Sequence, residues 1–295
     1  MKRGPVLVVG CGYLGTRLVL RLRDEGRRVV ALVRTPASCE QLVAKGLTVA
    51  RADLDEVRDL PPLPVAGAEI YYLVPPPPTG DTDPRLARCL DALGRQGHPA
   101  RVLYLSTTAV YGDRGGAWVN EDAPPRPGTA RGRRRLAAER CLRAWGRARG
   151  IATVVLRVAG IYGPGRLPLE RIRRRLPLLD PAAAPPTNRI HVDDLVSACR
   201  AAMERGRDGA IYNVSDGHPA PMADYFNAIA DRAGLPRPPL VSAAEAERVL
   251  TPGMRAYMRE SRRIDNRRLL EELGVRLRYP GLDVGLDACF AAGAE

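Results

Sequence analysis

The sequence predicts an α/β fold in which a doubly wound parallel sheet is accompanied by a smaller C-terminal lobe. Short apolar runs of strand length alternate with segments whose apolar residues recur every three or four positions, which is typical of a parallel sheet covered by helices. The first apolar run also leads directly into a glycine-rich turn. At 295 residues, the chain is long enough to bury a substantial core in one large domain or in two lobes.

The chain begins with a strand, a glycine-rich turn and a helix. Residues 5–9 form a continuous apolar run of the kind found in buried parallel strands, and Gly10, Gly12 and Gly15 follow it as G-x-G-x-x-G. The next segment has helical spacing of its apolar residues and ends at Gly26. In this context the glycines predict a dinucleotide-binding turn of the Rossmann type, with a pyrophosphate at the helix N-terminus. A glycine-rich turn of another α/β fold is the alternative.

The residue after the second strand indicates which dinucleotide is bound. A carboxylate there accepts a hydrogen bond from the ribose 2′-hydroxyl of NAD, whereas an arginine suits the 2′-phosphate of NADP. The second strand is expected over 28–33, and Arg34 follows it with no carboxylate in reach. The sequence therefore favours NADP as the cofactor over NAD. An Arg34 that is merely exposed is the alternative.

The alternation of strands and helices continues along the chain. Further strands are expected over 47–52, 69–74, 101–105 and 153–158. Pro84 opens a helix over 85–93, a position that suits proline because its missing N–H would have no partner there. Because ligands of such sheets bind at the carboxyl ends of the strands, the residues that follow each strand are the candidates for chemistry.

Short motifs after these strands resemble one known superfamily. Strand 101–105 leads into STTAVYG and strand 153–158 into AGIYGPG, while RIHVDD and YNVSD come later. With the glycine motif, this set in this order resembles the extended short-chain dehydrogenase/reductase (SDR) superfamily, the group of nucleotide-sugar epimerases and dehydratases. The resemblance covers nearly the whole chain, to the NRRL and YPG segments near its end.

The resemblance implies a nicotinamide dinucleotide at the carboxyl edge of the sheet. The glycine turn would hold the pyrophosphate, Asp53 and Leu54 would meet the adenine, and Val74 with Pro75 would line the ribose and nicotinamide side. Thr107 matches the Ser/Thr that hydrogen-bonds the substrate oxygen. The cofactor-binding residues expected are Gly10, Gly12, Tyr13, Leu14, Gly15, Arg34, Asp53, Leu54, Val74, Pro75, Ser106 and Arg135.

The same superfamily places Tyr-x-x-x-Lys on the helix after strand 101–105. The proline-rich loop 121–127 and the LAAE stretch 136–139 align this motif with Arg131 at the tyrosine position and Arg135 at the lysine position. Arg135 keeps the positive charge and can donate to ribose hydroxyls. Arg131 can stabilise a developing alkoxide, but it cannot exchange the proton because a guanidinium has a pKa above about 12. Without that motif, the chain resembles the atypical SDR proteins.

Two classes of function remain open. One is an NADP-dependent oxidoreductase or epimerase that acts on a nucleotide sugar or a carbohydrate-like substrate. The other is an NAD(P)-binding redox sensor or regulatory protein without turnover. The proton of the first would come from Tyr111 or Tyr162, for which packing roles are the alternative. The candidate catalytic residues are Thr107, Tyr111, Arg131 and Arg135.

The basic stretch 128–150 covers the helix that carries the altered motif. It contains eight arginines. At the angular spacing of a helix, Arg131 and Arg135 fall at the edge of the apolar face, towards the cofactor site. The arginines of the solvated face are Arg140, Arg143 and Arg147. In the later HVDD segment, Asp193 and Asp194 are candidates to cap the helix 192–202, and His191 is expected to pack rather than to catalyse.

The chain divides into two parts on this interpretation. Residues 1–165 are expected to form the NAD(P)-binding Rossmann domain, with return segments at about 189–214, and residues 166–295 mainly the substrate-binding lobe. The elements expected in the last third are a strand over 210–214, a helix over 222–233 and short helices between 242 and 274.

Composition limits the possible partners. The net charge is +13, but Lys2 and Lys45 are the only lysines among 46 basic residues, so the charge comes from arginine, as in GC-rich genomes, and is expected on solvated faces. No basic patch is interleaved with aromatic residues as a base-stacking surface requires, so nucleic-acid binding is not expected. The expected partner is a small-molecule substrate, with a nucleotide sugar as the candidate, and the chain is expected to be a monomer or homodimer.

The cysteines and the N-terminus point to a cytoplasmic protein. The six cysteines are scattered, with no C-x-x-C pair and no His cluster, so they predict no metal site and are expected to be small buried residues in a reducing compartment. The apolar run VLVVG is too short for a signal peptide or a membrane span.

Overall fold

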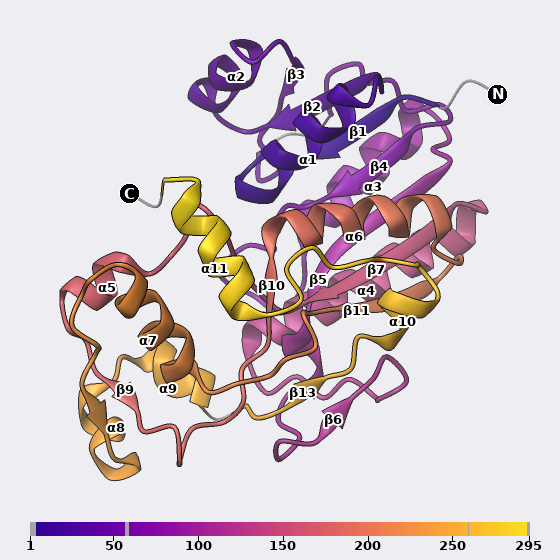
Figure 1. The fold of residues 1–295 in the computed structure, drawn as a ribbon. Helices are drawn as coiled ribbons and strands as arrows, with labels where there is room; N and C mark the ends of the chain where they lie inside the picture. Colours follow the sequence, from indigo (N-terminus) through magenta and orange to yellow (C-terminus); the bar gives the residue numbers. More distant parts are fainter. Residues whose placement is uncertain (1–3, 57–58, 259, 294–295) are drawn as a thin grey trace.

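A seven-stranded parallel sheet forms the centre of the protein, for which the computed structural model describes residues 4–56, 59–258 and 260–293. Its strands are β1 (Val6–Val9), β2 (Val29–Val33), β3 (Thr48–Arg51), β4 (Glu69–Tyr72), β5 (Arg101–Thr107), β7 (Ala152–Val158) and β11 (Ala210–Val214). Their order across the sheet is β11-β7-β5-β4-β1-β2-β3, so the direction of winding reverses between β1 and β4. The predicted α/β fold with a doubly wound parallel sheet is confirmed (Figure 1).

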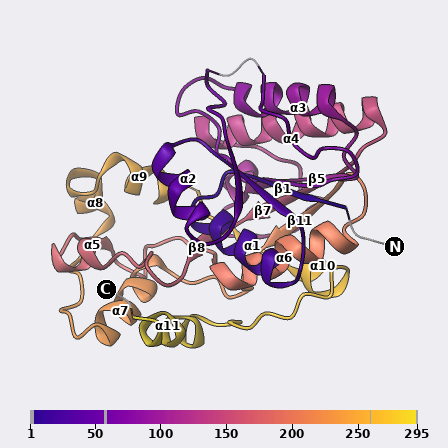
Figure 2. The same ribbon diagram turned by 90° about the horizontal axis from the view of Figure 1, so that it is seen from above.

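Helices cover both faces of this sheet (Figures 1 and 2). One face carries α1 (Tyr13–Asp24) and α6 (Val192–Arg205), and the other carries α3 (Pro84–Gln96) and α4 (Ala130–Arg149). Strand β1 is buried on both of its faces, so helices must cover both faces of the sheet. Its alternate residues Val6 and Val8 join the core beneath α1 and α6, whereas Leu7 and Val9 join the core beneath α3 and α4.

The remaining elements are short, and half of them belong to the last third of the chain. They are α2 (Pro36–Val43), the 3₁₀ turn η1 (Thr108–Tyr111), β6 (Trp118–Val119), β8 (Gly160–Tyr162), α5 (Leu169–Arg173), β9 (Leu178–Leu179), β10 (Arg189–His191), α7 (Met222–Arg232), β12 (Leu240–Val241), α8 (Ala243–Val249), α9 (Pro252–Met258), β13 (Arg263–Ile264), α10 (Arg267–Glu271) and α11 (Leu282–Ala291). A separate apolar cluster lies among α5, α7 and α11 and includes Phe226 and Leu286. Figure 1 shows α5, α7, α8 and α9 together at one side of the sheet.

Several element ends differ from the sequence-based expectation. Strand β5 continues through Ser106 and Thr107, which therefore point to opposite faces of the sheet. Helix α6 begins at Val192 as expected but continues to Arg205, and neither of the two aspartates caps it, because the His191 ring accepts the hydrogen bond from the Asp193 N–H at 3.2 Å. Asp194 instead accepts hydrogen bonds from two backbone N–H groups, those of Arg278 and Tyr279.

The expectation that arginines occupy solvated faces is wrong for part of them. Arg135, Arg157 and Arg189 are buried. Others donate to backbone carbonyl groups at or just after the C-terminal end of a helix. Arg101 donates to the carbonyl of Met203 at 2.6 Å, and Arg205 donates to that of Leu273 at 2.7 Å. These side chains provide several donors in a fixed fork, so much of the basic charge is used within the fold.

The described residues also bear on the cysteines, metals and membranes. The cysteines are unpaired; Cys89, Cys199 and Cys289 are buried, whereas the other three are half-buried, contrary to expectation. Within the described ranges no group of three or more His, Cys, Asp or Glu side chains could hold a metal ion. The same ranges contain no helix that is long and apolar enough to cross a membrane.

Candidate active site

The three glycines of the first turn have different surroundings. A Cβ at Gly10, whose φ is +95°, would lie 2.7 Å from the Val74 side chain, and a Cβ at Gly15 would lie 2.3 Å from the Gly10 carbonyl oxygen. A Cβ at Gly12 would meet no atom within 4 Å. Gly10 and Gly15 are therefore required by packing within the turn, whereas the space in front of Gly12 is open.

This open space belongs to a cavity of about 470 Å³ at the carboxyl ends of β1, β2, β3 and β4. The predicted residues that line it are Gly10, Gly12, Arg34, Asp53, Leu54, Val74 and Pro75. Gly12 is also the N-cap of α1, whose first turn directs N–H groups without intrahelical partners to this side. A pyrophosphate fits the place where a Cβ would otherwise stand, because it can accept these hydrogen bonds.

Near Arg34 this cavity contains polar residues that the sequence did not single out. Thr35 caps α2 by accepting from the Ser38 N–H at 3.2 Å, and the two hydroxyls lie 2.8 Å apart. Both residues line the cavity beside Arg34, which is exposed. Arg85 and Asp55 also line the cavity and form a 2.5 Å ion pair. The N-terminus of α1, the hydroxyls of Thr35 and Ser38, and the Arg34 guanidinium together form an anion-binding environment.

Tyr13 and Leu14 do not reach this cavity with their side chains. The Tyr13 hydroxyl donates to the carbonyl of Pro164 at 3.0 Å, and Arg17 donates to the same oxygen at 3.1 Å. Leu14 is buried in the core beneath α1. Any contact of these two residues with a cofactor would therefore use their backbone N–H groups.

Ser106 points to the opposite face of the sheet from Thr107, because side chains alternate along strand β5. Its hydroxyl donates to Glu139 of α4 at 2.5 Å, and Glu139 forms a 2.7 Å ion pair with Arg157 of β7. Both charged side chains are 3% exposed, so this is a buried, hydrogen-bonded pair. Neither the pair nor the direction of Ser106 was foreseen from the sequence. Ser106 is not among the described residues that line the cavity in front of the glycine turn.

Arg135 likewise is engaged within the protein. Its guanidinium donates to the carbonyl of Leu105 at 2.6 Å and to the Tyr104 hydroxyl at 3.2 Å. It therefore holds the end of β5 against α4, rather than lying among the described residues that line a cavity. Its neighbours on α4 hold the loop after β4, since Arg133 pairs with Asp81 and Arg134 donates to the Gly80 carbonyl.

A second cavity of about 390 Å³ opens at the ends of β5 and β7. Thr107 and Arg131, two of the candidate catalytic residues, both line it. Because β4 and β5 are paired neighbours in the sheet, this cavity follows the first one along the same edge. The structure thus brings two of the four candidate catalytic residues together.

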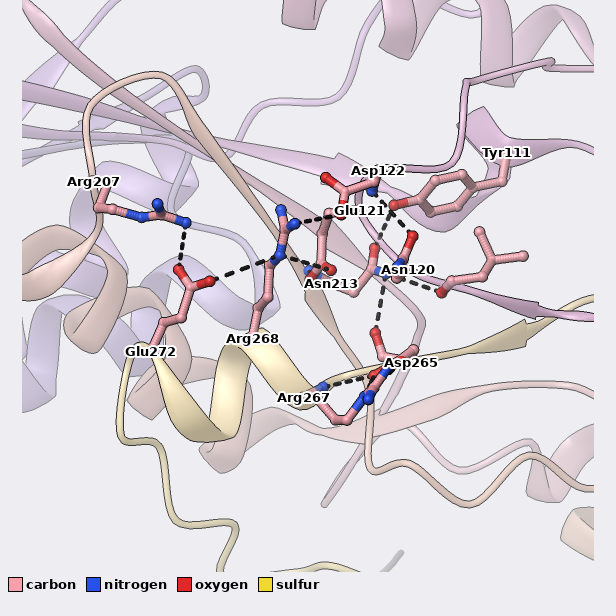
Figure 3. Close-up of polar contacts among 11 residues, drawn as sticks. Tyr111, Asn120, Glu121, Asp122, Arg207, Asn213, Asp265, Arg267, Arg268 and Glu272 are labelled. Atoms are coloured by element: carbon pink, nitrogen blue, oxygen red, sulfur yellow. Dashed lines mark hydrogen bonds and ion pairs between the residues drawn. The ribbon is translucent and has the colours of Figure 1, made fainter.

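Tyr111 is directed elsewhere. Its hydroxyl donates to the Asn213 side chain at 2.7 Å, and burial raises the pKa of Tyr111 to about 12. Figure 3 shows this phenol pointing to Asn213 within a polar network that includes Glu121 and Arg268. Tyr162 is also buried and lines a smaller cavity of about 130 Å³. Among the described residues that line the second cavity there is no tyrosine.

The second cavity includes two charged residues that sequence reasoning missed. Glu260 and Arg262 line it from the segment before β13, and they form a 2.9 Å ion pair. More than 120 residues separate them from Arg131, and no motif surrounds them, so no local signal placed them here.

Two family models match this chain, one over its N-terminal part and one over the part that follows. The model described as the NAD dependent epimerase/dehydratase family matches residues 84–215. The model described as ketopantoate reductase PanE/ApbA matches residues 6–96, the region that includes the glycine turn.

Two curated relatives match nearly the whole chain. A protein from Streptomyces sp. named 3-diazoavenalumate denitrifying reductase is 31% identical over 95% of this chain and 98% of its own. Protein YeeZ from Escherichia coli (strain K12) is 27% identical over 93% of this chain and 96% of its own.

Solved structures agree with this similarity. A functionally unknown conserved protein from Silicibacter pomeroyi has a TM-score of 0.85 and 36% identity, covering 99% of this chain and 100% of its own. MoeE5, solved in complex with UDP-glucose and NAD, has a TM-score of 0.74 and 26% identity, covering 98% of each chain.

Proposed function

Because the chain belongs to the NAD-dependent epimerase/dehydratase family, within the SDR superfamily, we propose that it is an NADP-dependent oxidoreductase or epimerase for a nucleotide sugar. One observation carries this proposal. The cavity in front of the glycine turn is followed, on neighbouring strand ends, by a second cavity that contains Thr107 and Arg131. This order suits a dinucleotide in the first cavity and a substrate in the second.

The first cavity would hold the cofactor through residues of this chain. The N–H groups at the start of α1 would bind the pyrophosphate, Asp53 and Leu54 would contact the adenine end, and Val74 would lie beside the nicotinamide ribose. When bound, the nicotinamide would supply a hydride donor or acceptor. Arg34, Thr35 and Ser38 would hold the 2′-phosphate of NADP.

An Arg34→Asp variant is expected to prefer NADH to NADPH, reversing the wild-type preference. The carboxylate would repel a 2′-phosphate and accept from a 2′-hydroxyl, so the ratio of the two affinities should change by at least about tenfold, or about 1.4 kcal/mol. Fluorescence titration of both dinucleotides measures the ratio. An unchanged ratio would mean that Arg34 does not contact the cofactor, and Arg28→Asp, at another exposed position, serves as the control.

The second cavity favours an anionic substrate with hydroxyl groups. Arg131 and Arg262 supply positive charge, while Thr107 and Asn188 supply hydrogen-bonding groups. The neighbour MoeE5, which was solved with UDP-glucose, supports the nucleotide-sugar class. The direct test is a titration with NADPH and NADH, followed by UDP-glucose and UDP-glucuronic acid with either oxidised cofactor. Failure to bind either dinucleotide would overturn the proposal.

A second candidate is a reductase whose reaction needs no proton donor. The described lining of the second cavity contains no tyrosine, and the 31% identical relative is named as a denitrifying reductase of a diazo compound. When an aryl diazonium ion receives hydride, dinitrogen leaves and a C–H bond remains, so no proton is transferred. The test is NADPH oxidation with 4-carboxybenzenediazonium, with release of nitrogen measured in parallel. Tight binding of NADPH without turnover of either substrate would favour a redox sensor.

A further inference from the structure

A segment before β13 is fixed against the loop that follows η1. The Arg114 N–H donates to the Ser261 carbonyl at 2.8 Å, and the Ser261 N–H donates to the Asp113 carboxylate at 2.8 Å. Two residues further on, the backbone N–H of Arg263 donates to the Ala117 carbonyl at 2.9 Å. These contacts hold Glu260 at a defined position beside the second cavity.

The two carboxylate oxygens of Glu260 have different surroundings. Oε2 lies 2.9 Å from Nη1 of Arg262, and the same nitrogen donates to the Gly112 carbonyl at 2.9 Å. Oε1 is buried and has no hydrogen-bond partner among the described residues. The side chain as a whole is 12% exposed. A buried carboxylate oxygen without a donor is unfavourable, so this oxygen is an acceptor available to a donor group of a ligand in the cavity that Glu260 lines.

The other described groups of the second cavity cannot exchange a proton near neutral pH. Arg131 and Arg262 are guanidinium groups that stay protonated, and the hydroxyls of Thr107 and its neighbours do not ionise in this range. Glu260 is the one carboxylate among the described residues that line this cavity. A carboxylate within hydrogen-bond reach of a substrate hydroxyl is a suitable general base.

On the basis of the proposed function, we propose that Glu260 is the proton-transfer group of this site and replaces the missing tyrosine. In the oxidation of a substrate alcohol, the O–H bond breaks and its proton binds to the Glu260 carboxylate. The carbon that bears this hydroxyl would lose its hydrogen as hydride to a bound oxidised nicotinamide, which would be reduced, and a C=O bond would form. In reduction the protonated carboxyl returns the proton. The cavity therefore requires a substrate with a hydroxyl or carbonyl group facing Glu260.

The test compares Glu260→Gln with Glu271→Gln, the same change at an exposed position on α10. Glutamine keeps the shape but cannot accept the proton, so kcat for nucleotide-sugar oxidation should fall by about 100-fold or more in Glu260→Gln alone. Calorimetry of UDP-glucose on the cofactor-free chain should give affinities within about threefold of wild type, and the melting temperature should be unchanged. These two measurements separate a lost base from a lost fold or site.

Chemical rescue supplies the second arm. Formate should restore turnover of Glu260→Ala by at least about tenfold, because it replaces the carboxylate, and it should have no effect on wild type. Turnover of Glu260→Gln within about threefold of wild type would overturn this inference while leaving the proposed function intact. If wild type binds NADPH but oxidises no nucleotide sugar, the proposed function fails and this inference fails with it. Equal loss in Glu260→Gln and Glu271→Gln would likewise overturn it.

Discussion

A Gly12→Val variant is expected to lose at least about 100-fold in NADPH affinity, or about 2.7 kcal/mol, with little change in stability. The reason is that the space in front of this residue is open and belongs to the first cavity. No atom lies within 4 Å of the Cβ position, so the folded chain accepts the side chain, but the valine would occupy the place proposed for the pyrophosphate. Titration of NADPH fluorescence and thermal unfolding measure the two quantities.

Gly281→Val is the matched control for this prediction. Gly281 is also the N-cap of a helix, α11, and a Cβ there would also meet no atom within 4 Å. It is not among the described residues that line either cavity, so its variant should bind NADPH as wild type does. If both variants bind NADPH normally, the glycine turn is not the pyrophosphate site.

In contrast, Gly15→Ala should lower stability itself, because its Cβ would meet the Gly10 carbonyl oxygen at 2.3 Å.

Glu139→Leu is expected to lower the free energy of unfolding by about 3 to 5 kcal/mol. The change would leave Arg157 as an uncompensated charge that is buried, with its side chain 3% exposed. It would also remove the acceptor of the Ser106 hydroxyl. Urea denaturation followed by circular dichroism measures the loss. The effect should be large because one substitution removes the partners of two buried groups.

The double variant Glu139→Leu with Arg157→Met distinguishes a lost charge partner from a poorly packed leucine. Replacing a buried ion pair by apolar residues of similar volume is often close to neutral, so the double variant should recover most of the stability lost by the single one. If the double variant is as unstable as Glu139→Leu, packing and not the unpaired charge is responsible. The fold would then depend on Glu139 in another way.

The layout of the sheet could be predicted because its signals are local. The run before Gly10 is apolar at every position, and the structure buries all four residues of β1 on both faces of the sheet. Helix α3 starts at Pro84, one residue before the range expected from the sequence, because Asp83 caps it. The boundaries moved by a few residues where caps and sheet pairing, rather than apolar spacing, decide where an element ends.

The inner part of the candidate site could not be predicted in the same way. The alignment brought Thr107 and Arg131 to one cavity, but the direction of Ser106 depends on strand β5 continuing two residues beyond its expected end. Tyr111 was a candidate proton donor with a packing role as the alternative, and its hydroxyl donates to Asn213, which lies 102 positions away along the chain. Partners at such separations are set by the packing of whole elements, which spacing along the sequence does not contain.

The contact between α1 and Pro164 has a thermodynamic consequence. Tyr13 and Arg17 both donate to this one carbonyl, so the turn proposed to bind the pyrophosphate is joined to the segment that leads into α5. If a substrate displaces Pro164 and thereby changes the affinity for the cofactor, the cofactor must change the affinity for the substrate by the same factor. The two ligands would then be linked through a single oxygen atom. The coupling free energy between them is measured by titrating each ligand in the presence and in the absence of the other, for wild type and for Tyr13→Phe.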